Sequence, residues 1–334
     1  MTEPLIRFNQ LSLSFASDEG RVRAVQDVTF DIQAGQTVGV VGESGCGKSV
    51  TAMSLMGLLP PQAARIDGGE ILFQGRDLLK LRSSQMADLR GNQLAMIFQE
   101  PMTALNPVLT IGEQLVEPLI RHRGESPKSA WTLATKMITE VGLARAESLM
   151  TSYPHQLSGG MLQRIMIAMA LSCKPQLLIA DEPTTALDVT VQAQILRLLR
   201  DQAQQNHMAL MLITHDLGVI AQMADHVVVM YAGKIVEQGA TADVLRNPLH
   251  PYTQGLIASR PTAGERRRRL YSIPGQVPSL AALPPYCAFT DRCGRATERC
   301  REGIPPLEGQ HRQAACFYSG LTTAQEDKDT ELQS

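Results

Sequence analysis

The sequence has almost no net charge, no long apolar run and no signal-like N-terminus. A formal net charge of −2 gives no general electrostatic reason to expect nucleic acid as a partner. The longest apolar run, residues 165–171, has seven residues, whereas a membrane-spanning helix needs about 18 or more. Residues 1–31 lack the basic-then-apolar pattern of a secretory signal peptide. We therefore expect a cytosolic chain without membrane spans, whose cysteines stay reduced or bind metal.

Length and composition indicate the size of the fold. The chain has 334 residues, of which 44% are hydrophobic and 19% charged, so its composition is globular rather than disordered. It is long enough for one large domain and one smaller domain with an ample apolar core.

A glycine-rich phosphate-binding motif, the P-loop, is the most informative stretch. It follows an apolar run at residues 37–41, precedes residues 50–56 of helical composition, and has the spacing G-x-x-x-x-G-K-[ST]. The glycines let backbone N–H groups surround a polyphosphate, and the helix N-terminus adds positive dipole character. The predicted nucleotide-binding residues are Gly42, Glu43, Ser44, Gly45, Cys46, Gly47, Lys48 and Ser49. Lys48 should neutralise the β- and γ-phosphates of ATP, and the Ser49 hydroxyl should ligate Mg²⁺.

Two later apolar strands end in polar side chains. Residues 177–180 are followed by Asp181 and Glu182, and an uninterrupted apolar strand suits the centre of a parallel sheet. Asp181 should reach Mg²⁺, directly or through water, and Glu182 should polarise the attacking water as a general base. The second strand, residues 209–214, is followed by His215, which could contact the γ-phosphate.

A second helix N-terminus is prepared for an anion. Ser158 is a suitable N-cap for a helix that ends near Cys173, and Gly159 and Gly160 leave the backbone N–H groups accessible. A nucleotide bound at the P-loop of the same chain does not explain this second anion site.

Hydrophobic patterns predict the surrounding elements. Residues 5–8, 11–15 and 24–32 read as half-buried strands of an antiparallel flank. Residues 95–98 form a short buried strand, and Gln99 stands where it ends. Phe15 could face outward and stack on a purine, although composition alone favours a core or edge phenylalanine.

A helical insert follows, with predicted helices at residues 111–121 and 129–141. The apolar face expected for the second helix consists of Leu133, Met137, Ile138 and Val141.

In combination, these motifs resemble the ATPase domains of ABC transporters. The P-loop, Gln99, residues 157–160, residues 177–182, Ala186-Leu187-Asp188 and His215 occur in that family's order and approximate spacing, over residues 4–245. The resemblance implies an α/β fold with a doubly wound core, an antiparallel β flank and a helical subdomain at about residues 100–170. It also implies a head-to-tail dimer around two ATP molecules, in which Ser158, Gly159 and Gly160 bind the γ-phosphate held by the partner.

The resemblance also implies roles for single residues. Phe15 would stack on the adenine, and Asp188 would belong to the nucleotide site. Gln99 and His215 would join Glu182 in catalysis, and Gln99 would join Ser49 and Asp181 at Mg²⁺.

Within this family, four stretches look like the ATPases of oligopeptide and dipeptide importers. They are residues 96–107, 166–173, 180–195 and 250–253. Met161 and Thr185 depart from the wider ABC pattern but fit this subfamily, whereas Leu162, where the subfamily often has arginine, is unexplained. The implied function is ATP hydrolysis that powers peptide import, with nickel or glutathione import as an alternative.

A chain without membrane spans cannot translocate a solute alone. The resemblance implies a second, homologous ATPase subunit in a heterodimer, two integral permease subunits and a periplasmic or extracellular peptide-binding protein. Its place would be the cytoplasmic face of the bacterial inner membrane, with permeases docked near residues 99–106. The rival is a soluble ABC protein acting on DNA or ribosomes, but such proteins usually have two fused cassettes or a long coiled coil, and neither occurs in this sequence.

The C-terminal part differs in composition. Residues 246–320 are proline-rich and form a predicted extension, and the polar residues 321–334 form a predicted disordered tail. The four arginines at 266–269 suit a solvated linker, or contact with anionic lipid or a partner subunit.

Four of the six cysteines lie in this extension. Cys287, Cys293, Cys300 and Cys316 have the spacing C-x₅-C-x₆-C-x₁₅-C. In a cytosolic chain, such clustering favours a metal or iron–sulfur centre over disulfides, and the intervals exceed those typical of zinc knuckles. Similar importer subunits hold a [4Fe–4S] cluster, so the resemblance favours one here, while Zn²⁺ and plain thiols stay open as alternatives.

Overall fold

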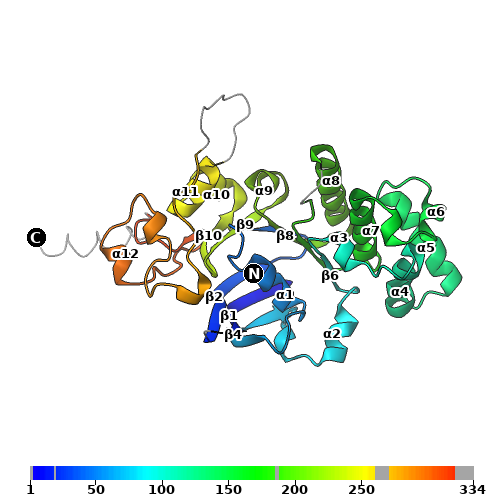
Figure 1. Ribbon diagram of the computed structural model, residues 1–334, viewed down its shortest axis with the longest axis horizontal. Coiled ribbons are helices and arrows are strands. Elements are labelled where there is room, and N and C mark those ends of the chain that lie inside the picture. Colours follow the sequence, from blue (N-terminus) through cyan, green and yellow to red (C-terminus); the bar gives the residue numbers. More distant parts are fainter. Residues whose placement is uncertain (1–2, 19, 185–187, 260–270, 320–334) are drawn as a thin grey trace, which may run out of the picture.

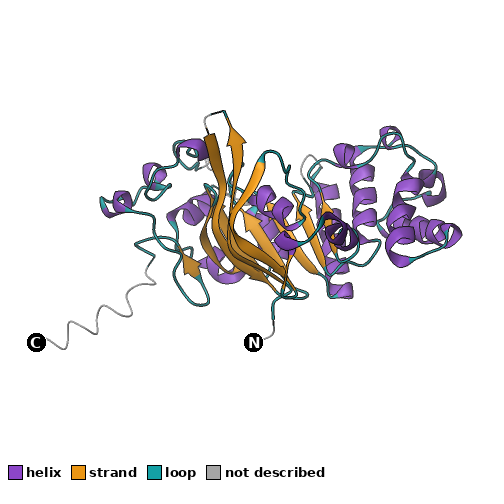
Figure 2. Cartoon of the chain, turned by 90° about the horizontal axis from the view of Figure 1, so that it is seen from below, coloured by secondary structure: helices purple, strands orange, loops and turns teal. Residues whose placement is uncertain are grey.

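Two β-sheets form the middle of the molecule, and helices lie around them and at one end (Figures 1 and 2). The computed structural model describes residues 3–18, 20–184, 188–259 and 271–319. The predicted tail, the arginine run at 266–269 and Thr185 lie outside these residues.

The first sheet is antiparallel and has the strand order β2-β1-β4-β5. Its strands are β1 (Ile6–Ser17), β2 (Gly20–Ile32), β4 (Ala64–Phe73) and β5 (Arg76–Asp77). The sequence predicted two strands where the structure has the single strand β1. The interruption in the alternation is a bulge: the pairing of β1 with β2 shifts register between Phe8 and Leu11, and Gln10 has a φ of 50°.

The second sheet carries the site and has the order β11-β10-β9-β3-β8-β7-β6. Strands β6, β7, β8, β3 and β9 are parallel, while β10 and β11 are antiparallel to their neighbours. The bounds are β3 (Thr37–Val41), β6 (Leu94–Ile97), β7 (Leu177–Asp181), β8 (Ala209–Thr214), β9 (His226–Tyr231), β10 (Lys234–Ala240) and β11 (Gln313–Ala314). Because β3, β7 and β8 are adjacent and parallel, the loops after them meet at one edge of the sheet.

Helices α4–α7 group at one end of the molecule, beside β6 (Figure 1). This part comprises α3 (Pro101–Ala104), α4 (Ile111–Arg123), α5 (Pro127–Glu140), α6 (Ala146–Met150) and α7 (Gly159–Leu171). The predicted apolar face of α5 was partly wrong: Ala130, Ala134 and Ile138 are buried, while Leu133 and Met137 are only half-buried. Small alanines at the interface let α5 pack closely against its neighbours, so the larger side chains turn toward its margin.

The remaining helices connect the parallel strands or lie near the C-terminus. They are α1 (Lys48–Leu55), α2 (Ser83–Leu89), α8 (Val189–Asn206), α9 (Leu217–Met223), α10 (Thr241–Arg246), α11 (Pro251–Ala258) and α12 (Arg299–Glu302), with short 3₁₀ turns at Leu78–Lys80, Pro154–Gln156, Leu280–Ala282 and Thr290–Arg292. No helix within the described ranges is long and apolar enough to cross a bilayer.

The C-terminal extension folds back onto the second sheet. Its strand β11 pairs with β10, and the side chain of Arg312 forms an ion pair of 2.7 Å with Glu237, whose carboxylate is fully buried. The extension therefore completes the edge of the sheet that carries the site.

His250 lies buried at the start of α11, where its Nδ1 accepts a hydrogen bond of 3.1 Å from the Tyr252 N–H. Burial lowers the pKa of His250 to about 3. The folded protein therefore stays unprotonated at His250 while the unfolded chain takes up a proton near pH 6.5, so the free energy of unfolding decreases as the pH falls from 6.5 toward 3.

We expect His250→Asn to remove this part of the acid sensitivity, since asparagine can still cap the helix. Between pH 7 and pH 5, wild type should lose about 2 kcal/mol more than the variant. Urea unfolding at both pH values measures the difference. Equal losses for the two proteins would contradict a buried, neutral His250.

Candidate nucleotide site

The P-loop has a conformation that only glycine can adopt at its first and last glycine positions. Gly42 has a φ of 154°, and a Cβ there would lie 2.2 Å from the Met230 carbonyl oxygen. Gly47 has a φ of 103°, and a Cβ there would lie 2.9 Å from the Ala24 carbonyl oxygen. Strands β9 and β2 thus press against the loop and fix its path.

Lys48 is held over the loop by its own backbone. Its ammonium donates hydrogen bonds of 2.8 Å to the Gly42 carbonyl and 3.0 Å to the Glu43 carbonyl, and lies 3.7 Å from the Cys46 sulfur. The side chain is buried. An ammonium has three donors, and sulfur is a weak acceptor, so the third N–H is suited to a phosphate oxygen.

Ser49 and Asp181 face each other across the end of the sheet. The Ser49 hydroxyl donates a hydrogen bond of 3.0 Å to the Asp181 carboxylate. Burial raises the pKa of Asp181, while the hydrogen bond from Ser49 opposes that rise. A cation bound between the two oxygens would offset the cost of burying this charge, so the pair is chemically suited to Mg²⁺.

The three predicted catalytic side chains converge. One oxygen of the Glu182 carboxylate lies 3.4 Å from the Gln99 amide nitrogen, and the other lies 3.3 Å from Nδ1 of His215. Glu182 also has a φ of 46°, an uncommon conformation that is typical of strained functional residues. The ends of β6, β7 and β8 supply these residues, as the sequence pattern indicated.

The Ser-Gly-Gly sequence forms the N-terminus of α7. The Ser158 hydroxyl caps the helix by accepting a hydrogen bond of 3.4 Å from the Met161 N–H, and a Cβ on Gly159 would have no atom within 4 Å. Ser158 and Gly159 are exposed and Gly160 is half-buried. Leu162, which the sequence left unexplained, is buried in the core, so an apolar residue suits its position.

Asp188 and Phe15 have other contacts in the structure. The Asp188 carboxylate caps α8 by accepting a hydrogen bond of 2.9 Å from the Val191 N–H. Phe15 is half-buried, pairs with Val22 and Ala64, and packs on the apolar core beneath the first sheet. Their predicted contacts with nucleotide remain predictions.

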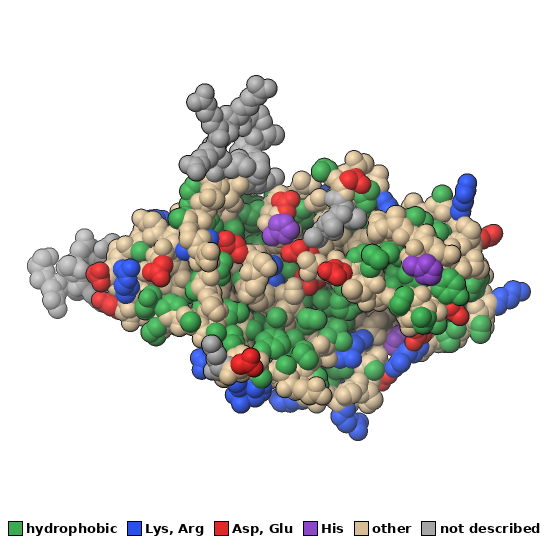
Figure 3. Space-filling view, in the orientation of Figure 1, with side chains coloured by type: hydrophobic (Ala, Val, Ile, Leu, Met, Phe, Trp, Pro, Cys, Tyr) green, Lys and Arg blue, Asp and Glu red, His purple; other side chains and the backbone are tan. Residues whose placement is uncertain are grey.

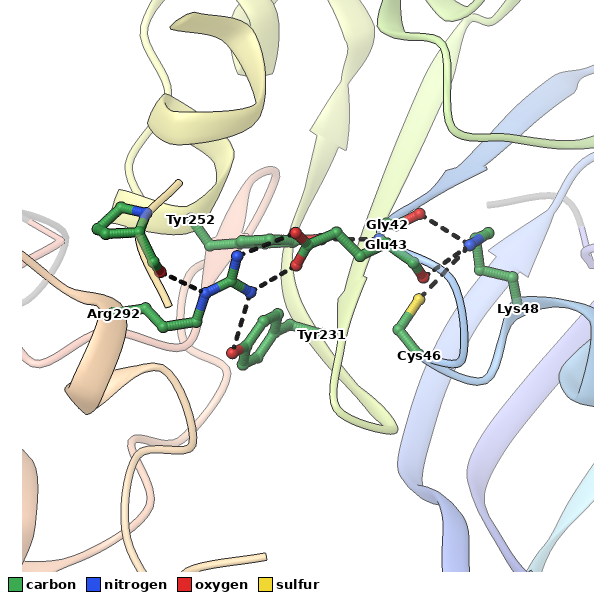
Figure 4. A network of polar contacts seen from close by, with 8 residues as sticks. Gly42, Glu43, Cys46, Lys48, Tyr231, Tyr252 and Arg292 are labelled. Carbon is green, nitrogen blue, oxygen red and sulfur yellow. Dashed lines mark hydrogen bonds and ion pairs between the residues drawn. The ribbon is translucent and has the colours of Figure 1, made fainter. Parts of the chain in front are cut away.

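Sequence reasoning missed three residues that hold the loops of the site. The Tyr252 hydroxyl accepts a hydrogen bond of 2.8 Å from the Glu43 N–H, and Arg292 forms an ion pair of 2.6 Å with the Glu43 carboxylate (Figure 4). The buried side-chain amide of Gln163 donates a hydrogen bond of 2.7 Å to the carbonyl of Pro183, the residue after Glu182. Tyr252 lies in the family-like stretch 250–253, but no motif in the sequence indicates the contacts themselves, because they join segments 20, 209 and 249 residues apart.

The four extension cysteines line one small pocket. All are free thiols, and burial raises the pKa of Cys287, Cys293 and Cys316. Within the described ranges, no group of three or more His, Cys, Asp or Glu side chains is already arranged to hold a metal ion.

Fold and site together define a P-loop ATPase, and comparisons with known proteins identify its class. The family model for ABC transporters matches residues 25–185. The dimeric structure of the ATP-binding cassette MJ0796 bound to ADP and Pi superimposes with a TM-score of 0.64 and 25% identity, over 71% of this chain and 98% of that one. A second dimeric structure of MJ0796, described as a bacterial ABC transporter cassette, has the same TM-score and 26% identity.

Relatives that match over nearly their whole length show which group of ABC transporter ATPases this chain resembles. The model of the oligopeptide/dipeptide transporter C-terminal region matches residues 236–300. The oligopeptide transport ATP-binding protein AppD of Bacillus subtilis is 48% identical over 94% of this chain and 96% of its own length. The probable D,D-dipeptide transport ATP-binding protein DdpD of Escherichia coli is 48% identical over 95% of this chain and 98% of its own length. The dipeptide transport ATP-binding protein DppD of B. subtilis is 49% identical over 91% of this chain and 90% of its own length. The chain belongs to this family of ABC transporter ATP-binding proteins.

Proposed function

We propose that this protein binds and hydrolyses ATP to drive import of dipeptides or oligopeptides through a membrane ABC transporter. The observation that carries the proposal is the meeting of Gln99, Glu182 and His215 beside the P-loop, together with the Ser49–Asp181 pair. Relatives about 48% identical over nearly the whole chain are peptide-transport ATP-binding proteins, which supports the peptide substrate.

Each group in the site has a chemical task. Lys48 and the loop N–H groups bind and neutralise the phosphates. Ser49, Asp181 and Gln99 would hold Mg²⁺, which neutralises developing charge on the phosphates when bound. Glu182 polarises the attacking water as general base, and His215 contacts the γ-phosphate.

Nucleotide binding tests the proposal directly. Purified wild type should bind ATP in the presence of Mg²⁺, and Lys48→Ala should bind it far more weakly, because one phosphate-neutralising charge is lost. Binding can be measured by titration of a fluorescent ATP analogue, with Lys174→Ala as a control that removes a lysine elsewhere. If purified wild type does not bind ATP in this titration, the proposal is wrong.

A second ATPase subunit completes the proposed site. Ser158, Gly159 and Gly160 form a helix N-terminus that suits a γ-phosphate bound to a partner cassette, and Phe15 and Asp188 complete each nucleotide site. The dimeric MJ0796 structures support such a two-cassette arrangement. We propose a heterodimer with a homologous subunit. Affinity purification from native membranes should recover that subunit with this chain, whereas recovery of homodimers alone would count against it.

The permeases dock, in this proposal, beside residues 99–106. An apolar groove of about 410 Å³ lies there, with Phe98 and Ala104 among its lining residues, and hydrophobic side chains gather between the first sheet and the helical end (Figure 3). Met102, on the adjoining helix α3, is 70% exposed. This docking places the protein at the cytoplasmic face of the bacterial inner membrane, together with two permeases and a peptide-binding protein.

The extension cysteines hold, we propose, a [4Fe–4S] cluster with a structural role. The support is that Cys287, Cys293, Cys300 and Cys316 line one pocket as free thiols in a segment with little regular structure. A cluster would fix this segment, and four thiolate ligands are the usual set for it.

Anaerobically purified protein should then be brown, with about four irons per chain and broad visible absorbance. Cys300→Ser should bleach it, while Cys173→Ser, which changes a cysteine outside the pocket, should not. A colourless protein with stoichiometric zinc would show that the four cysteines bind zinc instead of an iron–sulfur cluster. Four thiols that titrate freely in the native protein would rule out both metals.

A further inference from the structure

Glu43, the second residue of the P-loop, has partners in two C-terminal segments (Figure 4). Arg292 Nη1 and Nη2 donate hydrogen bonds of 2.6 Å and 3.0 Å to the two oxygens of its carboxylate. Its N–H donates to the Tyr252 hydroxyl at 2.8 Å, and its carbonyl accepts from the Lys48 ammonium at 3.0 Å. One residue thus joins the phosphate-binding lysine to two contacts that lie 209 and 249 residues away in the chain.

Arg292 is itself fixed in place. Its side chain is 5% exposed, and its Nε donates a hydrogen bond of 2.9 Å to the carbonyl of Pro274. The guanidinium carbon lies 5.8 Å from the ring centre of Tyr231 and 5.9 Å from that of Phe289. Hydrogen bonds to Glu43 raise the pKa of Arg292, so it stays charged throughout the usual pH range.

An aromatic cluster anchors both contacts of Glu43 in the same place. The rings of Tyr231 and Tyr252 have centres 4.6 Å apart, and the ring of Phe289 lies 5.3 Å from Tyr231 and 5.5 Å from Tyr252. Tyr231 and Tyr252 are almost fully buried, and Phe289 precedes the turn that carries Arg292. The extension therefore presents Arg292 to the P-loop from a rigid base.

We propose that Arg292 is a positioning residue of the nucleotide site, through which the C-terminal extension sets the conformation of the P-loop and its affinity for ATP. This inference rests on the proposed ATP-binding function. It assigns to the extension a role in the ATPase reaction, in addition to any role of its cysteines.

The physical reason is the position of Glu43 between Arg292 and Lys48. A two-bond ion pair to an arginine that is itself buried fixes both the distance and the orientation of the carboxylate. When it is loosened, the Glu43 peptide can move, and with it the carbonyl that holds the Lys48 ammonium. ATP must then fix the loop on binding, so affinity decreases without loss of any group that touches the phosphates.

A second, half-buried arginine provides a matched control. Arg312, also in the extension, forms an ion pair of 2.7 Å with the buried Glu237, which lies on β10 rather than in the P-loop. Arg292→Lys and Arg312→Lys make the same chemical change and keep the charge. Arg292 holds its carboxylate through two nitrogens, whereas Arg312 reaches Glu237 through Nη2 alone. Only the first should affect the P-loop.

The experiment measures ATP affinity by titration with a fluorescent ATP analogue, alongside thermal unfolding without nucleotide. We expect Arg292→Lys to raise the Kd for ATP by about three- to tenfold, and Arg312→Lys to leave it within about twofold even if it lowers Tm. Tyr252→Phe, which removes the other anchor of Glu43 and keeps the ring, should also raise the Kd. Glu43→Gln combined with Arg292→Lys should weaken binding less than the two single effects multiplied, because they break one interaction.

The outcomes separate this inference from the proposed function. If wild type binds ATP and Lys48→Ala does not, but Arg292→Lys binds like wild type, Arg292 is purely structural and the inference fails. It also fails if Arg312→Lys weakens ATP binding as much as Arg292→Lys, since the effect would then follow from general loosening of the extension. Absence of ATP binding in wild type would remove the proposed function and this inference together.

Discussion

Glu182→Gln should bind ATP as wild type does and hydrolyse it roughly 10²- to 10⁴-fold more slowly, as expected when a general base is lost. The amide keeps the size and shape of the carboxylate but cannot accept a proton from water. Because glutamine and glutamate tolerate the φ of 46° at this position equally, the change should not alter the backbone. Gln99 and His215 both lie within 3.4 Å of the carboxylate, so either could reorient toward the new amide, but neither supplies the missing base.

The measurement is steady-state ATP hydrolysis in the assembled transporter, with a parallel titration of ATP binding. Glu140→Gln, which makes the same change at an exposed position on α5 paired with Lys136, should leave both values unchanged. A turnover rate for Glu182→Gln near that of wild type would show that another residue activates the water. A large loss of ATP binding would instead show that Glu182 holds the nucleotide.

The sequence predicted the fold class well because its strongest signals are local. The P-loop needs only eight consecutive residues, and Asp181 and Glu182 follow an uninterrupted apolar strand. Parallel strands that are adjacent in one sheet bring their ends together, so the meeting of Gln99, Glu182 and His215 follows once that order of strands is accepted. Family resemblance supplied the doubly wound architecture, which hydrophobic periodicity alone does not specify, and the structure supplied the order of the strands.

Local patterns failed where the structure depends on distant packing. The bulge at Gln10 joined two predicted strands into β1, because a single irregular residue breaks the alternation without ending the strand. In α5, two of the three buried positions are alanines, Ala130 and Ala134, whose small size matters only in relation to the neighbouring helices. Arg292 lies 249 residues from Glu43, and no short motif could predict their contact.

Replacing Arg312 by methionine should destabilise the fold by about 3–5 kcal/mol, because it leaves the buried carboxylate of Glu237 without a cation. Glu237 is fully buried, and it accepts hydrogen bonds of 2.9 Å from the N–H groups of Leu249 and His250 as well as the ion pair of 2.7 Å with Arg312. Two amide donors alone cannot offset the cost of removing a full charge from water. Strand β11 should separate from β10 at the same time, since Arg312 directly precedes it.

Thermal unfolding should show a decrease in Tm of about 4–7 °C for Arg312→Met. The same change at Arg7, which pairs with Asp31 at the surface at 2.9 Å and is 47% exposed there, should cost less than about 1 kcal/mol. Adding Glu237→Gln to Arg312→Met should restore much of the lost stability, because the uncompensated charge is then absent. Two results would contradict this prediction: a Tm of Arg312→Met equal to that of wild type, or a further loss of stability when Glu237→Gln is added. Either would show that the two amide donors satisfy the Glu237 charge. The extension would then be held mainly by its apolar contacts and the pairing of β11 with β10.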